Sequence, residues 1–98
     1  MLGFAERKVP NGKLVKAQVE FQEKITDARF FGDFFLHPEN ALEAVEQTFL
    51  GQPVNFDPAR AEARIEKALQ RKKARLVGVS PLDFVLVAQE AMKSAWKK

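Results

Sequence analysis

The residues that could carry out covalent chemistry are few in this sequence of 98 residues. It has no cysteine, which excludes a thiolate nucleophile, a disulfide and a thiolate metal site. His37 is the only histidine, and one imidazole without partner groups does not define a catalytic site. The five glycines are too far apart for a phosphate-binding glycine loop. We therefore expect no catalytic, cofactor-binding or metal-binding residue here, and no enzyme activity of the chain alone.

Three carboxylates recur at helical spacing. Glu39, Glu43 and Glu46 fall on one stripe of a helix. Such a stripe can approach Mg²⁺, but one solvated row provides too few oxygen ligands to hold the ion. We interpret the row as an exposed acidic helix face.

The basic residues indicate binding rather than catalysis. The 16 Lys and Arg against 13 Asp and Glu give a net charge of +3, which permits an anionic partner without requiring one. Positions 60–75 hold seven basic and two acidic residues, whereas 30–59 holds five acidic residues and no Lys or Arg. Four basic residues lie nearly in one line on a helix: Arg60, Arg64, Lys67 and Arg71.

This basic row has two interpretations. It can hold phosphate or an acidic partner protein, or it can be a solvated face that Glu62 and Glu66 partly neutralise. A small nucleic-acid-binding module using the helix over 60–75 is therefore an alternative function. No aromatic residue is interleaved for base stacking, so nucleic acid is the less favoured partner.

Four of the nine phenylalanines lie within six residues, and an extended strand would place them on both of its faces. They are Phe30, Phe31, Phe34 and Phe35. A chain of this length covers one face of a small sheet with its own helices, but hardly both. Either some of these rings fill the core around a twist at Gly32, or some await another polypeptide.

The first third of the chain is patterned as strands. Apolar and polar residues alternate over 14–21, and Asn11-Gly12 favours a turn that pairs 6–10 with 13–21 as a hairpin. A third strand is predicted over 25–31. Ile25 and Ala28 share one face of that strand only if it contains a bulge.

Three helices are expected after the strands. The first covers 39–50 and stops at Gly51, the second begins after Asp57, and the third begins with a capping box at Ser80 and Asp83. The apolar face of the third helix comprises Val85, Ala88, Met92 and Trp96. The predicted fold class is α+β: a single domain, 1–98, with a small antiparallel sheet of about three strands packed against three helices, the strands first in sequence.

Two motifs follow each other along the sequence: Lys8-Val9-Pro10-Asn11-Gly12-Lys13 and, about twenty residues later, Gly32-Asp33-Phe34-Phe35, followed by a helix closing on Leu50-Gly51. In this order they resemble the C-terminal accessory domain of lipoate–protein ligases. The resemblance covers roughly residues 5–90. Since the sequence opens with methionine and holds no large domain, it looks like the bipartite ligases in which this domain is a separate subunit.

The resemblance implies a non-catalytic subunit that supports lipoate adenylation by docking on a separate catalytic subunit. That partner would bind ATP, Mg²⁺ and lipoate and transfer the lipoyl group to a lysine of an acceptor domain, in a dehydrogenase complex or a glycine-cleavage protein. The motifs carry over the interface candidates Lys8, Lys13, Gly32, Asp33, Phe34 and Phe35, to which we add the basic row. No stretch approaches the ~20 apolar residues of a membrane span, and a cytoplasmic location is expected.

Overall fold

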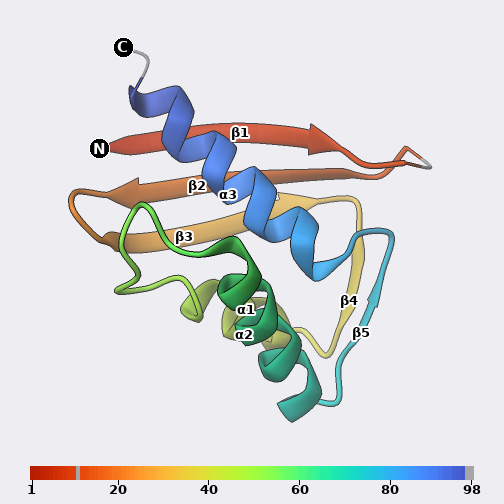
Figure 1. Cartoon of the computed structure of the whole chain (residues 1–98). Helices are drawn as coiled ribbons and strands as arrows, with labels where there is room; N and C mark the ends of the chain where they lie inside the picture. The colour runs from red at the N-terminus through yellow and green to blue at the C-terminus, as the bar shows by residue number, and fades with distance from the viewer. Residues whose placement is uncertain (11, 97–98) are drawn as a thin grey trace.

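The computed structural model describes residues 1–10 and 12–96, without the side chain of Trp96. In sequence order its elements are β1 (Leu2–Lys8), β2 (Leu14–Phe21), β3 (Ile25–Gly32), β4 (Phe35–His37), α1 (Asn40–Gln47), α2 (Pro58–Arg71), β5 (Arg75–Val77) and α3 (Pro81–Trp96) (Figure 1). The α+β prediction is confirmed. Asn11 of the predicted turn and the Trp96 side chain of the predicted apolar face lie outside the described part.

The main sheet is antiparallel, with β2 between β1 and β3. The alternation in β2 is confirmed, because Val15, Val19 and Phe21 are buried under the helices. The first strand begins at Leu2, opposite Glu20, and not at residue 6 as predicted. Its inward-facing residues there are small, because α3 lies against them, so this part of the strand lacks the apolar alternation of a typical core strand.

The predicted bulge is present between β2 and β3. Glu20 pairs with Asp27, whereas Phe21 pairs with Ile25, so Thr26 is the extra residue. This shift brings Ile25 and Ala28 onto the same buried face, at 1% and 3% exposure.

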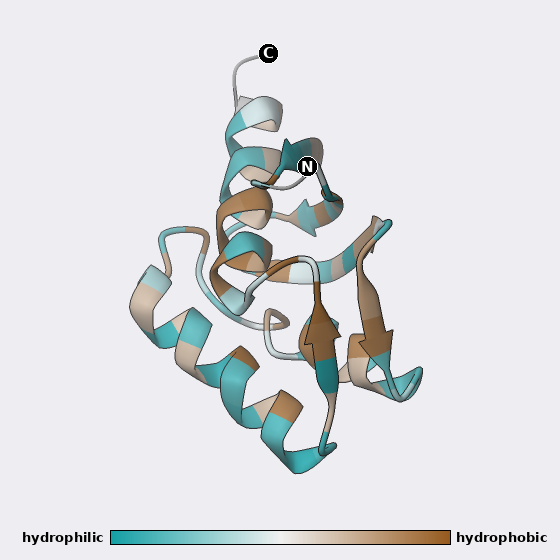
Figure 2. Ribbon diagram, turned by 90° about the vertical axis from the view of Figure 1, so that its right-hand side faces the viewer, coloured by the Kyte–Doolittle hydropathy of each residue, from teal (hydrophilic) through white to brown (hydrophobic). Residues whose placement is uncertain are grey.

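A second, two-stranded sheet was missed by the sequence analysis. In it β4 pairs with β5, with Phe35 opposite Val77 and His37 opposite Arg75. Each strand has three residues, which is too short for period-two alternation to stand out. In Figure 2 both strands are largely brown, because they consist mainly of apolar residues.

Helix α3 runs across one face of the main sheet, over β1 and β2, while α1 lies beside β3 and α2 packs against α1 and α3 (Figure 1). The predicted cap of α2 is confirmed, because Asp57 Oδ1 accepts from the Ala59 amide at 3.1 Å. Of the predicted capping box at α3, one half is present: Asp83 Oδ2 accepts from the Ser80 amide at 2.8 Å, and the Ser80 hydroxyl donates to the same oxygen at 3.0 Å. The first helix ends at Gln47, earlier than predicted, because the chain leaves it to bond to the start of β3. Over the described residues, no helix combines the length and the apolar character needed to cross a membrane.

Groups from the helical half of the chain occupy hydrogen-bonding positions along both outer edges of the main sheet. On β3, the Phe30 amide donates to Glu46 Oε2 at 2.9 Å, and the Ile25 amide donates to the Gln52 carbonyl at 2.9 Å. On β1, Ser94 Oγ donates to the Phe4 carbonyl at 2.9 Å. These bonds block the positions at which a further strand would pair, so the edges are protected against strand addition.

Glu46 therefore has a structural role that its spacing did not predict. The expected exposed acidic row is wrong at this residue, because Glu46 is half-buried against β3. Burial raises the pKa of Glu46 above its ordinary value of 4.5, against the smaller opposing effect of the Phe30 amide.

The raised pKa determines how stability responds to pH at Glu46. The folded state holds this proton more tightly than the unfolded state, so the contribution of Glu46 to stability falls as pH rises through its folded pKa. We expect Glu46→Gln, which keeps an acceptor for Phe30, to be more stable than the natural protein at pH 7, with the difference vanishing below about pH 4. Glu46→Ala removes the acceptor and is expected to lose about 1 kcal/mol. Urea unfolding at several pH values measures both effects, and a gap that widens as pH falls would contradict the assignment.

Candidate docking surfaces

Asp33 ties the turn after β3 to the start of β2. Its Oδ1 accepts from the Leu14 amide at 2.6 Å, and its own amide donates to the Leu14 carbonyl at 3.2 Å. At Gly32 a β-carbon would stand 2.1 Å from that same carbonyl oxygen and 2.9 Å from the Phe34 ring. Gly32 and Asp33 thus build the corner, and their direct structural role is to hold it closed.

The four clustered phenylalanines divide into two inward and two outward rings. Phe30 and Phe34 both form T-shaped contacts with Phe84 in α3, with ring centroids 5.0 and 5.3 Å away. Phe31 and Phe35 are 51% and 53% exposed. Of the alternatives left open by the sequence, core filling applies to the first pair, and the second pair is free to contact another polypeptide.

An apolar patch lies on the small sheet beside this corner. Phe35 and Val77 are directly opposite each other across the strands, at 53% and 46% exposure, and His37 stacks on Phe35 with an interplanar angle of 13°. The aliphatic stem of Lys13 passes close to Gly78, at the end of β5. We call Lys13, Phe35 and Val77 the corner patch.

The six motif residues are brought together by the folded chain. Lys8 pairs with Leu14, the residue to which Asp33 bonds, so the hairpin end carrying Lys8 and Lys13 adjoins the corner. Lys8, Lys13 and Phe35 are exposed and available for contact, whereas Phe34 is partly buried against the core. Sequence reasoning missed Val77, because only the pairing with β4 places it beside Phe35.

A second exposed aromatic pair lies on the uncovered face of the main sheet. Phe4 and Phe31, at 57% and 51% exposure, line a hollow of about 430 Å³ with Lys16 and Gln18 between them. The sequence analysis missed Phe4, because the first strand was predicted to begin after it. The alternation of Leu2, Phe4 and Glu6 with small residues was the available signal.

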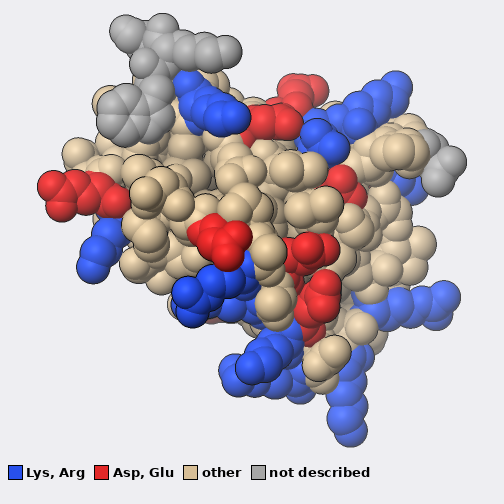
Figure 3. All heavy atoms as spheres, in the orientation of Figure 1, with Lys and Arg blue, Asp and Glu red and all other residues tan. Residues whose placement is uncertain are grey.

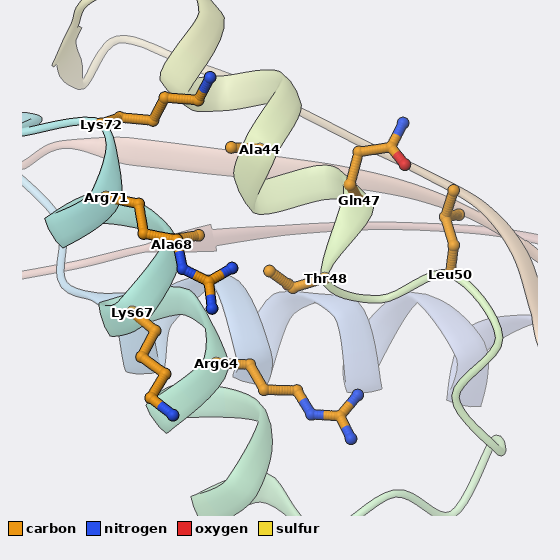
Figure 4. Close-up of a pocket in the computed structure, with 9 residues that line it drawn as sticks. All are labelled: Ala44, Gln47, Thr48, Leu50, Arg64, Lys67, Ala68, Arg71 and Lys72. Atoms are coloured by element: carbon orange, nitrogen blue, oxygen red, sulfur yellow. The ribbon is translucent and has the colours of Figure 1, made fainter.

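The basic row is exposed along α2, and three of its members line a groove between α1 and α2. The groove measures about 450 Å³, and its walls are Ala44, Gln47, Thr48, Leu50, Arg64, Lys67, Ala68, Arg71 and Lys72. Figure 4 shows the Arg71 side chain extending from α2 toward Thr48 at the end of α1, whereas the Arg64 side chain extends along the side of the loop that follows α1. In Figure 3 basic side chains gather at the lower edge of the molecule, where Figure 1 places α2.

Among the described residues, neither Glu62 nor Glu66 forms an ion pair with this row. The ion pairs found within residues 1–10 and 12–96 join Arg7 to Asp83 and Glu90, and Arg29 to Asp27. Positions two apart on a helix are separated by about 200° of rotation, so the two glutamates project away from the arginines that precede them.

The ten predicted interface residues form two groups in the structure. The six motif residues lie at the corner, and the four residues of the basic row lie along α2.

Comparisons with known proteins give one structural likeness. No family model matches this sequence, and no curated protein matches it either. The fold is similar to that of a chain from the solved structure of an archaeal lipoylation system, described as a bipartite lipoate protein ligase and its E2 lipoyl domain from Thermoplasma acidophilum. The TM-score is 0.69 at 22% identity, over 89% of this chain and 93% of that chain. The likeness shows a shared fold, and the family resemblance seen in the sequence agrees with it as far as the fold is concerned.

Proposed function

We propose that this chain is a cytoplasmic, non-catalytic accessory subunit of a bipartite lipoate–protein ligase. The observation that carries the proposal is the fold shared, over nearly the full length of both chains, with a component of the archaeal lipoylation system. The two sequence motifs add independent support, because the structure brings them together at one corner.

In this proposal the chemistry belongs to a separate catalytic subunit. That subunit binds ATP, Mg²⁺ and lipoate, forms lipoyl-adenylate and transfers the lipoyl group to a lysine of an acceptor domain. The present chain binds the adenylation-competent state of its partner more tightly than other states and so increases the population of that state. This requires contact with the partner, but no reactive group on the accessory chain.

The corner patch is the surface that we assign to this docking. It combines two apolar side chains on the paired strands β4 and β5 with a flanking lysine, which matches the apolar centre and polar rim of protein interfaces. Asp33 and Gly32 hold the hairpin against the corner, so the patch is preformed. Preformed side chains lose little conformational entropy on binding.

The function is tested by reconstitution. A purified ligase catalytic subunit that lacks its own accessory domain is supplied with lipoate, ATP and Mg²⁺, with and without this chain, and lipoyl-adenylate is measured. We expect faster adenylate formation when the chain is present. Equal rates, together with no complex on size-exclusion chromatography, would refute the proposal.

The docking surface is tested by Phe35→Ser combined with Val77→Ser. Each side chain is about half exposed, so folding is expected to survive, while the affinity for the catalytic subunit falls by about tenfold or more. The matched control is Phe4→Ser with Phe31→Ser, which removes a similarly exposed pair from the uncovered sheet face. Calorimetric titration of both variants gives the affinities. A large loss in the control and none at the corner would show that docking uses the sheet face.

No specific observation favours the nucleic-acid alternative. The groove beside the basic row has no aromatic side chain among its lining residues, so it offers no stacking platform for bases.

A further inference from the structure

The groove between α1 and α2 gathers four basic side chains. Arg64, Lys67, Arg71 and Lys72 line it, and none of them forms an ion pair with a carboxylate within residues 1–10 and 12–96. A second hollow of about 280 Å³ shares Leu50 and Arg64 with the groove and adds Arg60, and one carboxylate, that of Asp57, also lines it. The two hollows therefore form one track, along which basic side chains outnumber this single carboxylate.

The backbone at this track does not favour a small anion. The residues that line it from α1, Ala44 and Gln47, belong to the last turn, as do Ala68 and Arg71 of α2, with Lys72 just beyond. The carbonyl ends of helices carry partial negative charge, which stabilises the cations but repels an anion placed at the helix ends. Phosphate sites typically use the opposite, amide ends of helices. Any anion here must be held by side chains.

The spacing of the cations requires an extended occupant with several charges. At a helical rise of 1.5 Å per residue, Arg64 and Arg71 are separated by about 10 Å, and Arg60 and Arg71 by about 16 Å. A single carboxylate or phosphate group cannot reach across that distance. Carboxylates at every fourth residue of an α-helix are about 6 Å apart and can meet successive cations of the row.

The uncharged residues that line the groove favour a protein over a nucleic acid. They include Ala44, Ala68 and Leu50, of which Leu50 is 38% exposed. Aliphatic side chains of a partner can be buried there, whereas bases would find no ring on which to stack.

We propose that this groove binds an acidic, amphipathic helix of another protein. Carboxylates of that helix pair with Arg64, Lys67 and Arg71, and its aliphatic side chains pack on Ala44, Leu50 and Ala68. The groove is distinct from the corner patch, so the chain can hold one protein at the corner and a second along α2. The inference does not depend on the identity of the protein bound at the corner.

The test is a titration of the full ¹⁵N-labelled chain, followed by NMR, at low salt. The probe is a synthetic helical peptide of about 15 residues, with glutamates at every fourth position on one side and leucines on the other. The comparison probes are the same peptide with glutamine for glutamate, and an oligothymidylate of about 15 nucleotides. We expect the acidic peptide to shift the amide signals of Ala44, Thr48 and Ala68, and the glutamine peptide to bind at least tenfold more weakly.

Charge reversal locates the contact. Arg64→Glu with Arg71→Glu is expected to lower the affinity for the acidic peptide at least tenfold. The same variant is expected to bind a version of the peptide that carries lysine in place of glutamate. The control Lys73→Glu with Arg75→Glu changes the net charge equally outside the groove and is expected to leave the affinity within about twofold.

Three results would overturn the proposal. One is the absence of shifts at the groove with the acidic peptide. Another is equal affinity for the acidic and glutamine peptides, which would make the contact purely apolar. The third is tighter binding of the oligothymidylate at the same amides, with affinity falling steeply as salt rises, which would assign the track to nucleic acid. The assay contains no ligase subunit, so its failure leaves the reconstitution experiment unaffected.

Discussion

Gly3→Ala is expected to lower the free energy of unfolding by about 3 kcal/mol, because α3 lies directly against β1 at this residue. A β-carbon on Gly3 would stand 1.9 Å from the carbonyl oxygen of Ala91 and 2.7 Å from its carbonyl carbon. These are backbone atoms in the middle of a helix, so they cannot rotate away as a side chain would. The helix as a whole must shift, which disturbs its packing across β1 and β2.

The control for this prediction is a glycine with open space around it. Gly51 has φ +84°, and a β-carbon there meets nothing within 4 Å, so Gly51→Ala carries only backbone strain of about 1 kcal/mol. Urea unfolding of both variants separates steric conflict from strain. Equal losses in the two variants would show that α3 adjusts to the added methyl group, and that the close approach does not constrain residue 3.

Phe84→Ala is expected to cost about 3–5 kcal/mol, the range observed when buried rings are removed. Phe84 is fully buried and its ring meets both Phe30 and Phe34, so it joins α3 to β3 and to the corner. Beyond the loss of global stability, the corner should loosen. Faster hydrogen exchange of the Leu14 and Asp33 amides, which bond across the corner, would report this.

Two comparisons keep this second prediction testable if Phe84→Ala does not fold. Phe84→Leu keeps much of the volume but loses the ring contacts, and a loss of about 1.5 kcal/mol is expected. Phe35→Ala removes a ring that is 53% exposed and is expected to lose less than about 1 kcal/mol. Thermal unfolding ranks the three variants. If Phe35→Ala were as damaging as Phe84→Leu, the division into core rings and outward rings would be wrong.

The protected edges of the main sheet limit how a partner protein can bind. Bonds from Glu46 and Ser94 block β3 and β1 at positions where another strand would pair. The surfaces left open are the outer sheet face, the corner patch and the groove along α2. Partners are therefore expected to bind through side chains rather than by strand addition.

Features that depend on neighbouring residues were predictable from the sequence alone. The alternation of β2, the cap at Asp57 and the capping box at Ser80 and Asp83 involve contacts or periodicities within a few positions. The bulge in β3 also followed locally, because Ile25 and Ala28 are apolar but out of phase. The basic row was visible as a helical spacing, although the groove beside it was not.

Features that depend on distant partners were decided by the tertiary structure. Strands β4 and β5 stabilise each other across about forty residues of chain, and neither has enough residues to be recognised separately. Glu46 became a half-buried acceptor only because β3 presents the Phe30 amide to it, and the clustered rings were divided by where α3 places Phe84. Local patterns determine which backbone conformation a segment favours. Which faces and edges are covered depends on packing between segments that the linear sequence keeps apart.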